Sequence, residues 1–100
     1  MSLPRPYEDF QKSLRLEHPP DMWPEGLKAL WWEGRGNWYA SRDIAQEINS
    51  DLGNWIHAYL HRKEGDDWNA GYWYQRAGRA FPKKSLEEDF QDLVLFVLDQ

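Results

Sequence analysis

Hydrophobic residues recur along this chain at helical spacing. They repeat at intervals of three and four, and the clearest run lies in the middle of the chain, at Leu52, Trp55, Ile56, Tyr59 and Leu60. No stretch alternates apolar and polar residues between hairpin turns, β-branched residues are scarce, and threonine is absent. The pattern therefore predicts an all-α protein of about six short helices and no sheet.

Residues that favour helix ends separate these patterns. Pro6 and Pro24 suit the first turns of a first and a second helix. The candidate N-caps of the later helices are Asn37, Ser50 or Asp51, Asp66 and Ser85, and the last of these begins a Ser-Leu-Glu-Glu capping box. The candidate stops are Gly34, Gly36, Gly65 and Gly78, because glycine tolerates the positive φ of many helix ends.

The length of 100 residues fits one domain, 1–100. Within it we expect an N-terminal helix and proline-rich connector (1–23), a helical-hairpin core (24–80) and a C-terminal helix (85–100). Aromatic residues make up 16% of the chain, which supplies large rings for a core.

A faint internal repeat lies within the predicted core. Ala29 precedes Gly36 by the same spacing as Ala58 precedes Gly65. Around Gly65, two antiparallel helices would bring Ala58 close to Ala70. The large, small and stop positions of a tetratricopeptide-like hairpin at 52–78 would then be Tyr74, Ala77 and Pro82. The first copy is weaker, because serine replaces the second alanine.

The segment at 55–79 reads WIHAYLHRKEGDDWNAGYWYQRAGR. It resembles a family of short, uncharacterised, mainly bacterial proteins with the pattern W-x-H-A-x-L-H-R-x-E-G-D-x-x-N-A-x-Y-W-Y-x-R-A-G-R. The resemblance covers about residues 24–80, through the upstream stretches LKALW and GNW. It implies a small all-helical protein and carries over no catalytic residue, substrate or cofactor.

Three polar residues gather opposite the apolar stripe of the predicted fourth helix. His57, His61 and Glu64 fall within a narrow arc, so they could reach one metal ion. The pattern lacks the glutamate that follows the first histidine of a hydrolytic zinc helix, and a fourth ligand would have to come from elsewhere, such as Asp66 or His18. The alternative is a histidine that hydrogen-bonds at a helix seam. We predict no bound metal, no cofactor and no catalytic residue.

The predicted fifth helix is aromatic on both sides. Ala70, Trp73, Tyr74 and Ala77 form one stripe, and Trp68 and Tyr72 lie roughly opposite. Either the fourth and sixth helices cover the two faces, or an aromatic and polar groove opens between the helices at 52–64 and 67–78. Such a groove would suit a sugar, a peptide or an aromatic metabolite. Its candidate ligand-binding residues are His57, His61, Glu64, Trp68, Asn69, Tyr72 and Arg76.

The net charge and the composition limit the classes of partner and the cellular location that we expect. A net charge of -5 argues against nucleic-acid binding, and no apolar run approaches the ~20 residues of a membrane span. The absence of cysteine excludes disulfides and thiolate metal sites and fits a cytoplasmic protein, as does the lack of a visible signal peptide.

Three functions stay open. The first is a small binding or interaction module for an unknown protein or small-molecule ligand. The second is a small metal-dependent or acid–base enzyme that uses His57, His61 and Glu64. The third is a homodimer through the last helix, since apolar residues extend beyond its expected buried face of Leu86, Phe90, Leu93 and Val97. The additional apolar residues are Val94, Leu95, Phe96 and Leu98.

Overall fold

The computed structural model describes residues 7–99, which form six α-helices and no strand. The all-α prediction is therefore confirmed. The helices are α1 (Tyr7–Ser13), α2 (Glu25–Gly34), α3 (Trp38–Ala45), α4 (Asp51–Lys63), α5 (Asp67–Arg76) and α6 (Leu86–Leu98). The expectation for Pro6 lies outside the described residues, and Pro24 is the N-cap of α2 rather than a member of its first turn.

The helix caps form where the sequence predicts them. Three N-cap side chains, those of Asn37, Ser50 and Asp66, each accept a hydrogen bond from a backbone amide three residues ahead. At α6, Ser85 and Glu88 form the complete capping box. The glycines with positive φ are Gly36, Gly65 and Gly78, at 83°, 88° and 76°. Each directly follows the C-cap residue of a helix, and this conformation costs glycine little.

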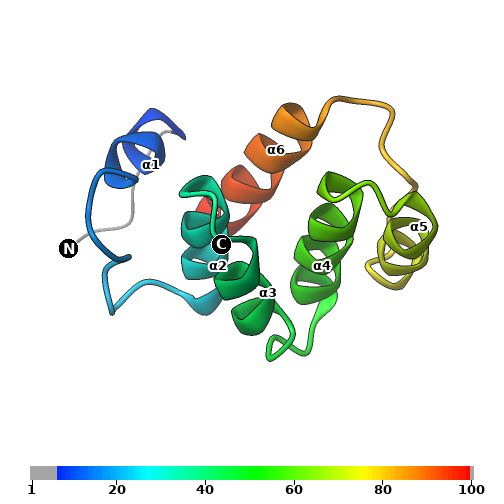
Figure 1. The fold of residues 1–100 in the computed structure, drawn as a ribbon, viewed down its shortest axis with the longest axis horizontal. Helices are drawn as coiled ribbons and strands as arrows, with labels where there is room; N and C mark the ends of the chain where they lie inside the picture. Colours follow the sequence, from blue (N-terminus) through cyan, green and yellow to red (C-terminus); the bar gives the residue numbers. More distant parts are fainter. Residues whose placement is uncertain (1–6, 100) are drawn as a thin grey trace.

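The helices pair into two antiparallel hairpins (Figure 1). One hairpin joins α2 to α3 and the other joins α4 to α5, whereas α6 packs against α2 and α4 and also contacts α1. Helices α1 and α5 lie at opposite ends of the molecule (Figure 1). Among residues 7–99, no helix is long and apolar enough to cross a membrane.

The core lies where α2, α4 and α6 meet. The predicted apolar stripe of α4 is buried at Trp55, Ile56, Tyr59 and Leu60. Ala58 and Ala70 are both fully buried within the α4–α5 hairpin, as a close approach of these helices requires. Trp31 is the largest fully buried side chain, and its indole donates to the carbonyl of Ser13 at 3.0 Å, which ties α1 to α2.

The outer face of α5 is uncovered. Trp68 is 82% exposed and Tyr72 is 48% exposed, whereas Ala70 and Tyr74 on the inner face are buried. The expectation that α4 and α6 cover the two faces of this helix is therefore wrong. Helix α5 lies at the edge of the molecule with α4 on its inner side, because α6 packs against α2 and α4 instead.

The last helix buries more of its apolar surface than its sequence pattern suggests. Val94 and Leu98, which we expected to need cover from another chain, are buried inside the protein itself. Leu95 and Phe96 stay 40% and 38% exposed, and the Phe96 ring packs edge-on against Trp55 at 5.4 Å between centroids. The apolar surface that motivated a homodimer is thereby reduced to these two residues.

Candidate binding site

The centre of the candidate site is a histidine stacked on an indole. His57, in the middle of α4, lies against Trp73 of α5, with 4.2 Å between ring centroids and 27° between the planes. Burial lowers the pKa of His57 below its ordinary value, and the nearby charges of His61 and Arg42 lower it further. His57 is therefore neutral at pH 7, and its ring offers one hydrogen-bond donor and one acceptor.

This stack forms one wall of a cavity of about 210 Å³. Arg76 lines it beside the two rings, and the opposite wall comes from the end of α3, the loop that follows and the first turn of α4. The residues of that opposite wall are Ala45, Gln46, Ile48, Asn49, Gly53 and Asn54. The two parts of the lining are joined where the side-chain amide of Asn54 donates to the backbone carbonyl of Arg76 at 3.3 Å.

Arg76 brings a positive charge that no carboxylate among residues 7–99 neutralises. Its guanidinium lies over the rings of Tyr72 and Trp73, at 5.7 and 5.2 Å from their centroids, and donates to the Tyr72 hydroxyl at 3.2 Å. Within residues 7–99, no carboxylate oxygen lies within salt-bridge distance of it. The first turn of α4 carries the partial positive charge of a helix N-terminus, which the carboxylate of Asp51 in the same turn partly offsets. The cavity is thus suited to an anionic group.

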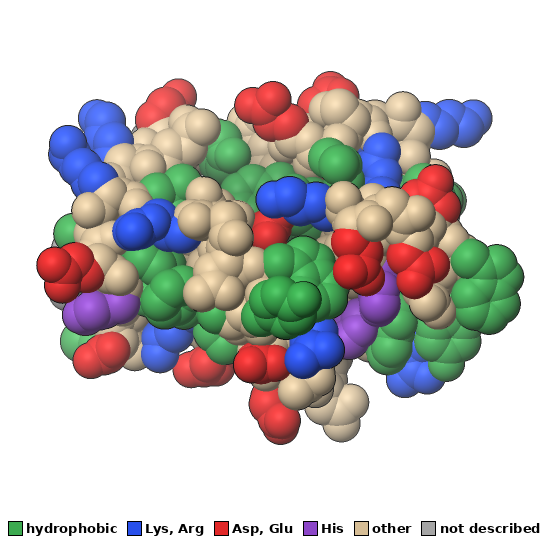
Figure 2. Space-filling view, in the orientation of Figure 1, with side chains coloured by type: hydrophobic (Ala, Val, Ile, Leu, Met, Phe, Trp, Pro, Cys, Tyr) green, Lys and Arg blue, Asp and Glu red, His purple; other side chains and the backbone are tan. Residues whose placement is uncertain are grey.

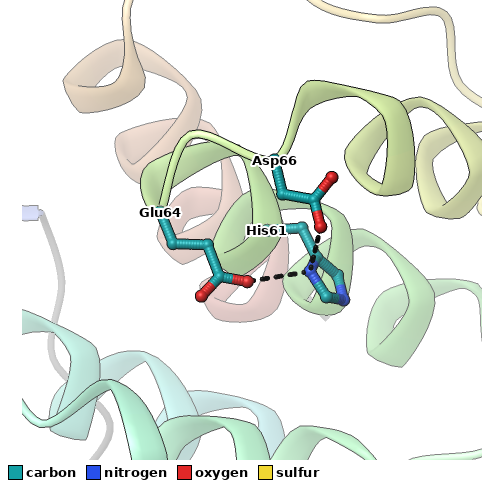
Figure 3. A group of neighbouring side chains, drawn as sticks. All are labelled: His61, Glu64 and Asp66. Atoms are coloured by element: carbon teal, nitrogen blue, oxygen red, sulfur yellow. Dashed lines mark hydrogen bonds and ion pairs between the residues drawn. The ribbon is translucent and has the colours of Figure 1, made fainter.

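A separate cluster of polar side chains, those of His61, Glu64 and Asp66, lies at the turn between α4 and α5 (Figure 3). The Nδ1 atom of His61 is 3.1 Å from a carboxylate oxygen of Glu64 and 3.9 Å from one of Asp66. One ligand atom from each of the three residues lies within 4.8 Å of the others. Asp66 also accepts from the Asn69 side chain at 2.6 Å, and this hydrogen bond lowers the pKa of Asp66.

The predicted histidine cluster is therefore only partly assembled. The rings of His57 and His61 are 4.9 Å apart, but His57 stacks on Trp73 and does not belong to the group of approaching ligand atoms. Asp66, which the sequence analysis named as a possible additional metal ligand, does belong to that group. The other such residue, His18, has its recorded contact with the carbonyl of Pro19.

The seven candidate residues occupy separate places rather than one wall. Two of them, His57 and Arg76, line the cavity. Tyr72 supports Arg76, and Trp68 extends into solvent on the outer side of α5. The remaining three, His61, Glu64 and Asn69, belong to the turn around Asp66. Figure 2 shows hydrophobic side chains over α5 at the end of the molecule, and histidine and acidic side chains between α5 and α4.

Several lining residues escaped the sequence analysis. Gln46, Asn49 and Asn54 carry no periodic signal, because they lie in a loop or on the polar side of a helix end. Trp73 was placed in the buried stripe of α5, yet it is half-buried and forms a wall. A usable signal was the glycine at position 53, which lets the loop backbone approach α4.

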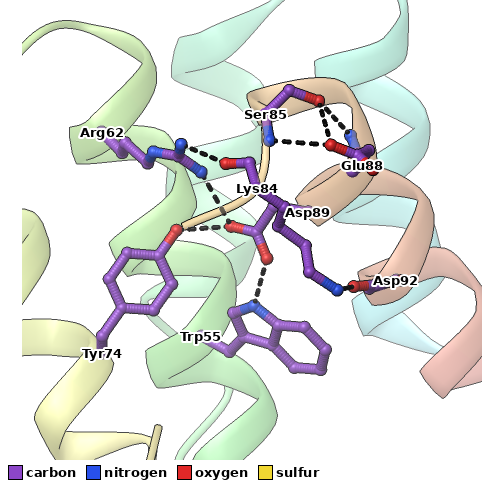
Figure 4. Close-up of polar contacts among 8 residues, drawn as sticks. All are labelled: Trp55, Arg62, Tyr74, Lys84, Ser85, Glu88, Asp89 and Asp92. Carbon is purple, nitrogen blue, oxygen red and sulfur yellow. Dashed lines mark hydrogen bonds and ion pairs between the residues drawn. The ribbon is translucent and has the colours of Figure 1, made fainter. Parts of the chain in front are cut away.

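A buried carboxylate was also missed (Figure 4). Asp89 of α6 is 3% exposed and accepts from the Trp55 indole at 3.1 Å and from the Tyr74 hydroxyl at 2.5 Å. Arg62 lies 3.8 Å from it and donates to the Lys84 carbonyl at 2.6 Å. Burial and the neighbouring Asp89 raise the pKa of Tyr74, so its hydroxyl stays a proton donor. The network joins α4, α5 and α6, and both carboxylate oxygens are already used.

No family model matches the chain, and neither does any curated protein or solved structure. The resemblance of the segment at 55–79 to a bacterial family stays a prediction.

The environment of His57 leads to a testable titration. In the folded protein its NMR titration midpoint should lie below 6.5, because burial disfavours the imidazolium. As pH falls below 6.5, the unfolded chain binds a proton that the folded chain resists, so the free energy of unfolding should decrease. Trp73→Leu should raise the midpoint toward 6.5, whereas Trp68→Leu, on the exposed face of the same helix, should leave it unchanged. A wild-type midpoint at or above 6.5 would contradict this account.

Proposed function

We propose that the protein is a small helical binding module whose ligand enters the cavity beside His57, Trp73 and Arg76. The observation that carries this proposal is the guanidinium of Arg76, which forms no ion pair with a carboxylate in the described part of the chain and lies at the wall of a cavity that a neutral histidine also lines. The proposed ligand is a small carboxylate with a neighbouring amide, such as the end of a peptide.

Size and chemistry both support this class of ligand. A cavity of about 210 Å³ is smaller than the roughly 300–1,000 Å³ of sites for drug-sized molecules. Arginine recognises a carboxylate through paired N–H donors. The side chains of Gln46, Asn49 and Asn54 supply both donors and acceptors for an amide. The Trp73 ring supplies a flat apolar surface for the rest of the ligand.

A matched pair of probes tests the proposal. N-acetylglycinate carries a carboxylate and an amide, and N-acetylglycinamide replaces the carboxylate by a second amide. In ¹⁵N–¹H NMR titrations at pH 7, N-acetylglycinate should give saturable shifts at the backbone amides of Gly53 and Asn54. The neutral amide should bind about tenfold more weakly, because a hydrogen bond to a charged group contributes roughly 1.5–3 kcal/mol.

Two variants locate the effect. Arg76→Gln should weaken N-acetylglycinate binding by about tenfold, whereas Arg15→Gln removes an exposed arginine near α1 and should change nothing. Equal responses to the two probes, or an undiminished response in Arg76→Gln, would refute the proposed carboxylate site.

A divalent cation at the α4–α5 turn is the second candidate. The supporting observation is the approach of the ligand atoms of His61, Glu64 and Asp66 to within 4.8 Å of one another, and imidazole with carboxylates suits Zn²⁺. Zn²⁺ should then raise the melting temperature of the wild type and of His18→Ala but not of His61→Ala. No rise in the wild type would remove this candidate and, with it, the metal-dependent form of the enzyme hypothesis.

The proposed helical repeat finds support in the two hairpin turns. The amide of Asn37 donates to the carbonyl of Trp32, and 29 positions later the amide of Asp66 donates to that of His61, both at 2.9 Å. The residues after the two N-caps match as well, because Ser41 and Ala70 are both fully buried. The tetratricopeptide-like character of the second hairpin and a cytoplasmic location stay proposals.

A further inference from the structure

A buried carboxylate at the end of α2 has one oxygen that accepts no hydrogen bond from residues 7–99. Glu33 is 3% exposed, and its Oε2 atom accepts a hydrogen bond from the ammonium of Lys63. Its Oε1 atom is buried and accepts no hydrogen bond from any described residue. Burying a charged oxygen without a donor is unfavourable, so the position is suited to an N–H donor from outside the chain.

Glu33 lines a cavity of about 260 Å³ between α2, α4 and the start of α6. The other lining residues are Gly34, Tyr59, Lys63, Leu86, Glu87 and Phe90. None of them lines the cavity at His57, so the two sites are separate. Two carboxylates and one ammonium give this second cavity a formal charge of about -1 at neutral pH.

The apolar part of the wall complements a cation. The rings of Tyr59 and Phe90 lie 5.6 Å apart, and aromatic faces attract ammonium groups. Among residues 7–99, the Tyr59 hydroxyl takes part in no hydrogen bond that the structure records, so it is a second acceptor. Burial raises the pKa of Tyr59, and the negative charges of Glu33 and Asp89 raise it further, which agrees with a negative potential here.

We propose that this cavity binds a primary ammonium group, with one N–H donated to Glu33 and the attached carbon chain packed against Tyr59, Phe90 and Leu86. The ammonium of Lys63 already donates a hydrogen bond of this kind to the other carboxylate oxygen, Oε2. Because Oε1 is fully buried, the Glu33 carboxylate has to rotate before this oxygen meets an incoming ammonium, and the terminal torsion of a glutamate is soft enough for that. The ammonium belongs either to a free amine or to a lysine side chain of another protein.

Neutral and charged probes of one shape test the proposal. In ¹⁵N–¹H NMR titrations at constant ionic strength, n-propylammonium chloride should give saturable shifts at the amides of Gly34 and Leu86. Neither 1-propanol nor sodium chloride should do so. Nα-acetyl-lysinamide represents the lysine source, and tighter binding of it than of propylammonium would assign the site to a protein side chain. Equal shifts with propanol, or no saturable shift with either amine up to about 100 mM, would refute the proposal and leave a water-filled cavity.

One variant and its control identify the carboxylate. Glu33→Gln keeps the shape of the side chain and should weaken propylammonium binding by about tenfold or more. Glu47→Gln removes an exposed charge after α3 and should bind like the wild type. Undiminished binding in Glu33→Gln would overturn the assignment. This inference is independent of the carboxylate site, because N-acetylglycinate is followed at Gly53 and Asn54 and its binding should persist in Glu33→Gln.

Discussion

Asp89→Ala should lower the free energy of unfolding by about 3–5 kcal/mol. The substitution leaves the Trp55 indole and the Tyr74 hydroxyl without their acceptor, and it leaves Arg62 without the nearest negative charge. Each buried donor that loses its partner costs roughly 1–3 kcal/mol. Since a domain of this size is stable by about 5–15 kcal/mol, the loss takes a large part of the total.

Chemical denaturation at pH 7 measures this effect, and a neighbouring residue provides the control. Asp92, one helical turn further along α6, forms an exposed ion pair with Lys84. Asp92→Ala should therefore cost no more than about 1 kcal/mol. Tyr74→Phe removes one donor but leaves the carboxylate in place, so its cost should fall between those of the two aspartate variants. Equal stabilities of Asp89→Ala and Asp92→Ala would show that the buried network contributes little.

The helix boundaries could be predicted from the sequence because their causes are local. An N-cap such as Asn37 acts on an amide three residues away, and a glycine such as Gly65 adopts positive φ next to the helix that it ends. The apolar stripe of α4 could also be predicted from the sequence, since burial of one helix face follows from periodicity. These features need no knowledge of the rest of the chain.

Contacts between distant segments could not be predicted in the same way. Asp89 lies 34 residues from Trp55, and nothing in its own surroundings distinguishes it from the other acids at the start of α6. The exposure of α5 depended on the direction of α6, which periodicity does not give. From the sequence, Trp68 and Tyr72 were therefore compatible with a covered face as well as with an open one.

The segment at 55–79 illustrates how residues that look functional can also build the fold. Gly65 and Asp66 form the turn and the cap of the hairpin, and Tyr74 holds Asp89. Arg79 lies over the Trp55 ring, at 3.4 Å from its centroid. Of this segment, His57, Trp73 and Arg76 line the cavity to which we assign ligand binding. The many aromatic and charged residues of this segment thus have two roles, since one helical hairpin supplies both central packing and a wall of the proposed site.

Two helical glycines should respond in opposite ways to alanine. At Gly53, a Cβ atom would lie 2.0 Å from the carbonyl oxygen of Ile48, which is backbone and cannot rotate away. Gly53→Ala should therefore lower the free energy of unfolding by about 3 kcal/mol, at the upper end of the usual cost of overpacking. At Gly71, in α5, the nearest atom would be a ring carbon of Phe81 at 3.9 Å, an ordinary contact.

Gly71→Ala should accordingly raise the free energy of unfolding by about 0.5–1 kcal/mol, because alanine loses less backbone entropy than glycine in a helix. Because both variants replace glycine by alanine, their denaturation midpoints compare the effect of the same substitution at the two positions. Gly53→Ala should also weaken N-acetylglycinate binding, since the α3–α4 loop that it displaces forms a wall of the cavity, whereas Gly71→Ala should retain it. A Gly53→Ala variant as stable as the wild type would mean that the loop does not approach α4 this closely, and the wall formed by Gln46 and Asn49 would then have to lie elsewhere.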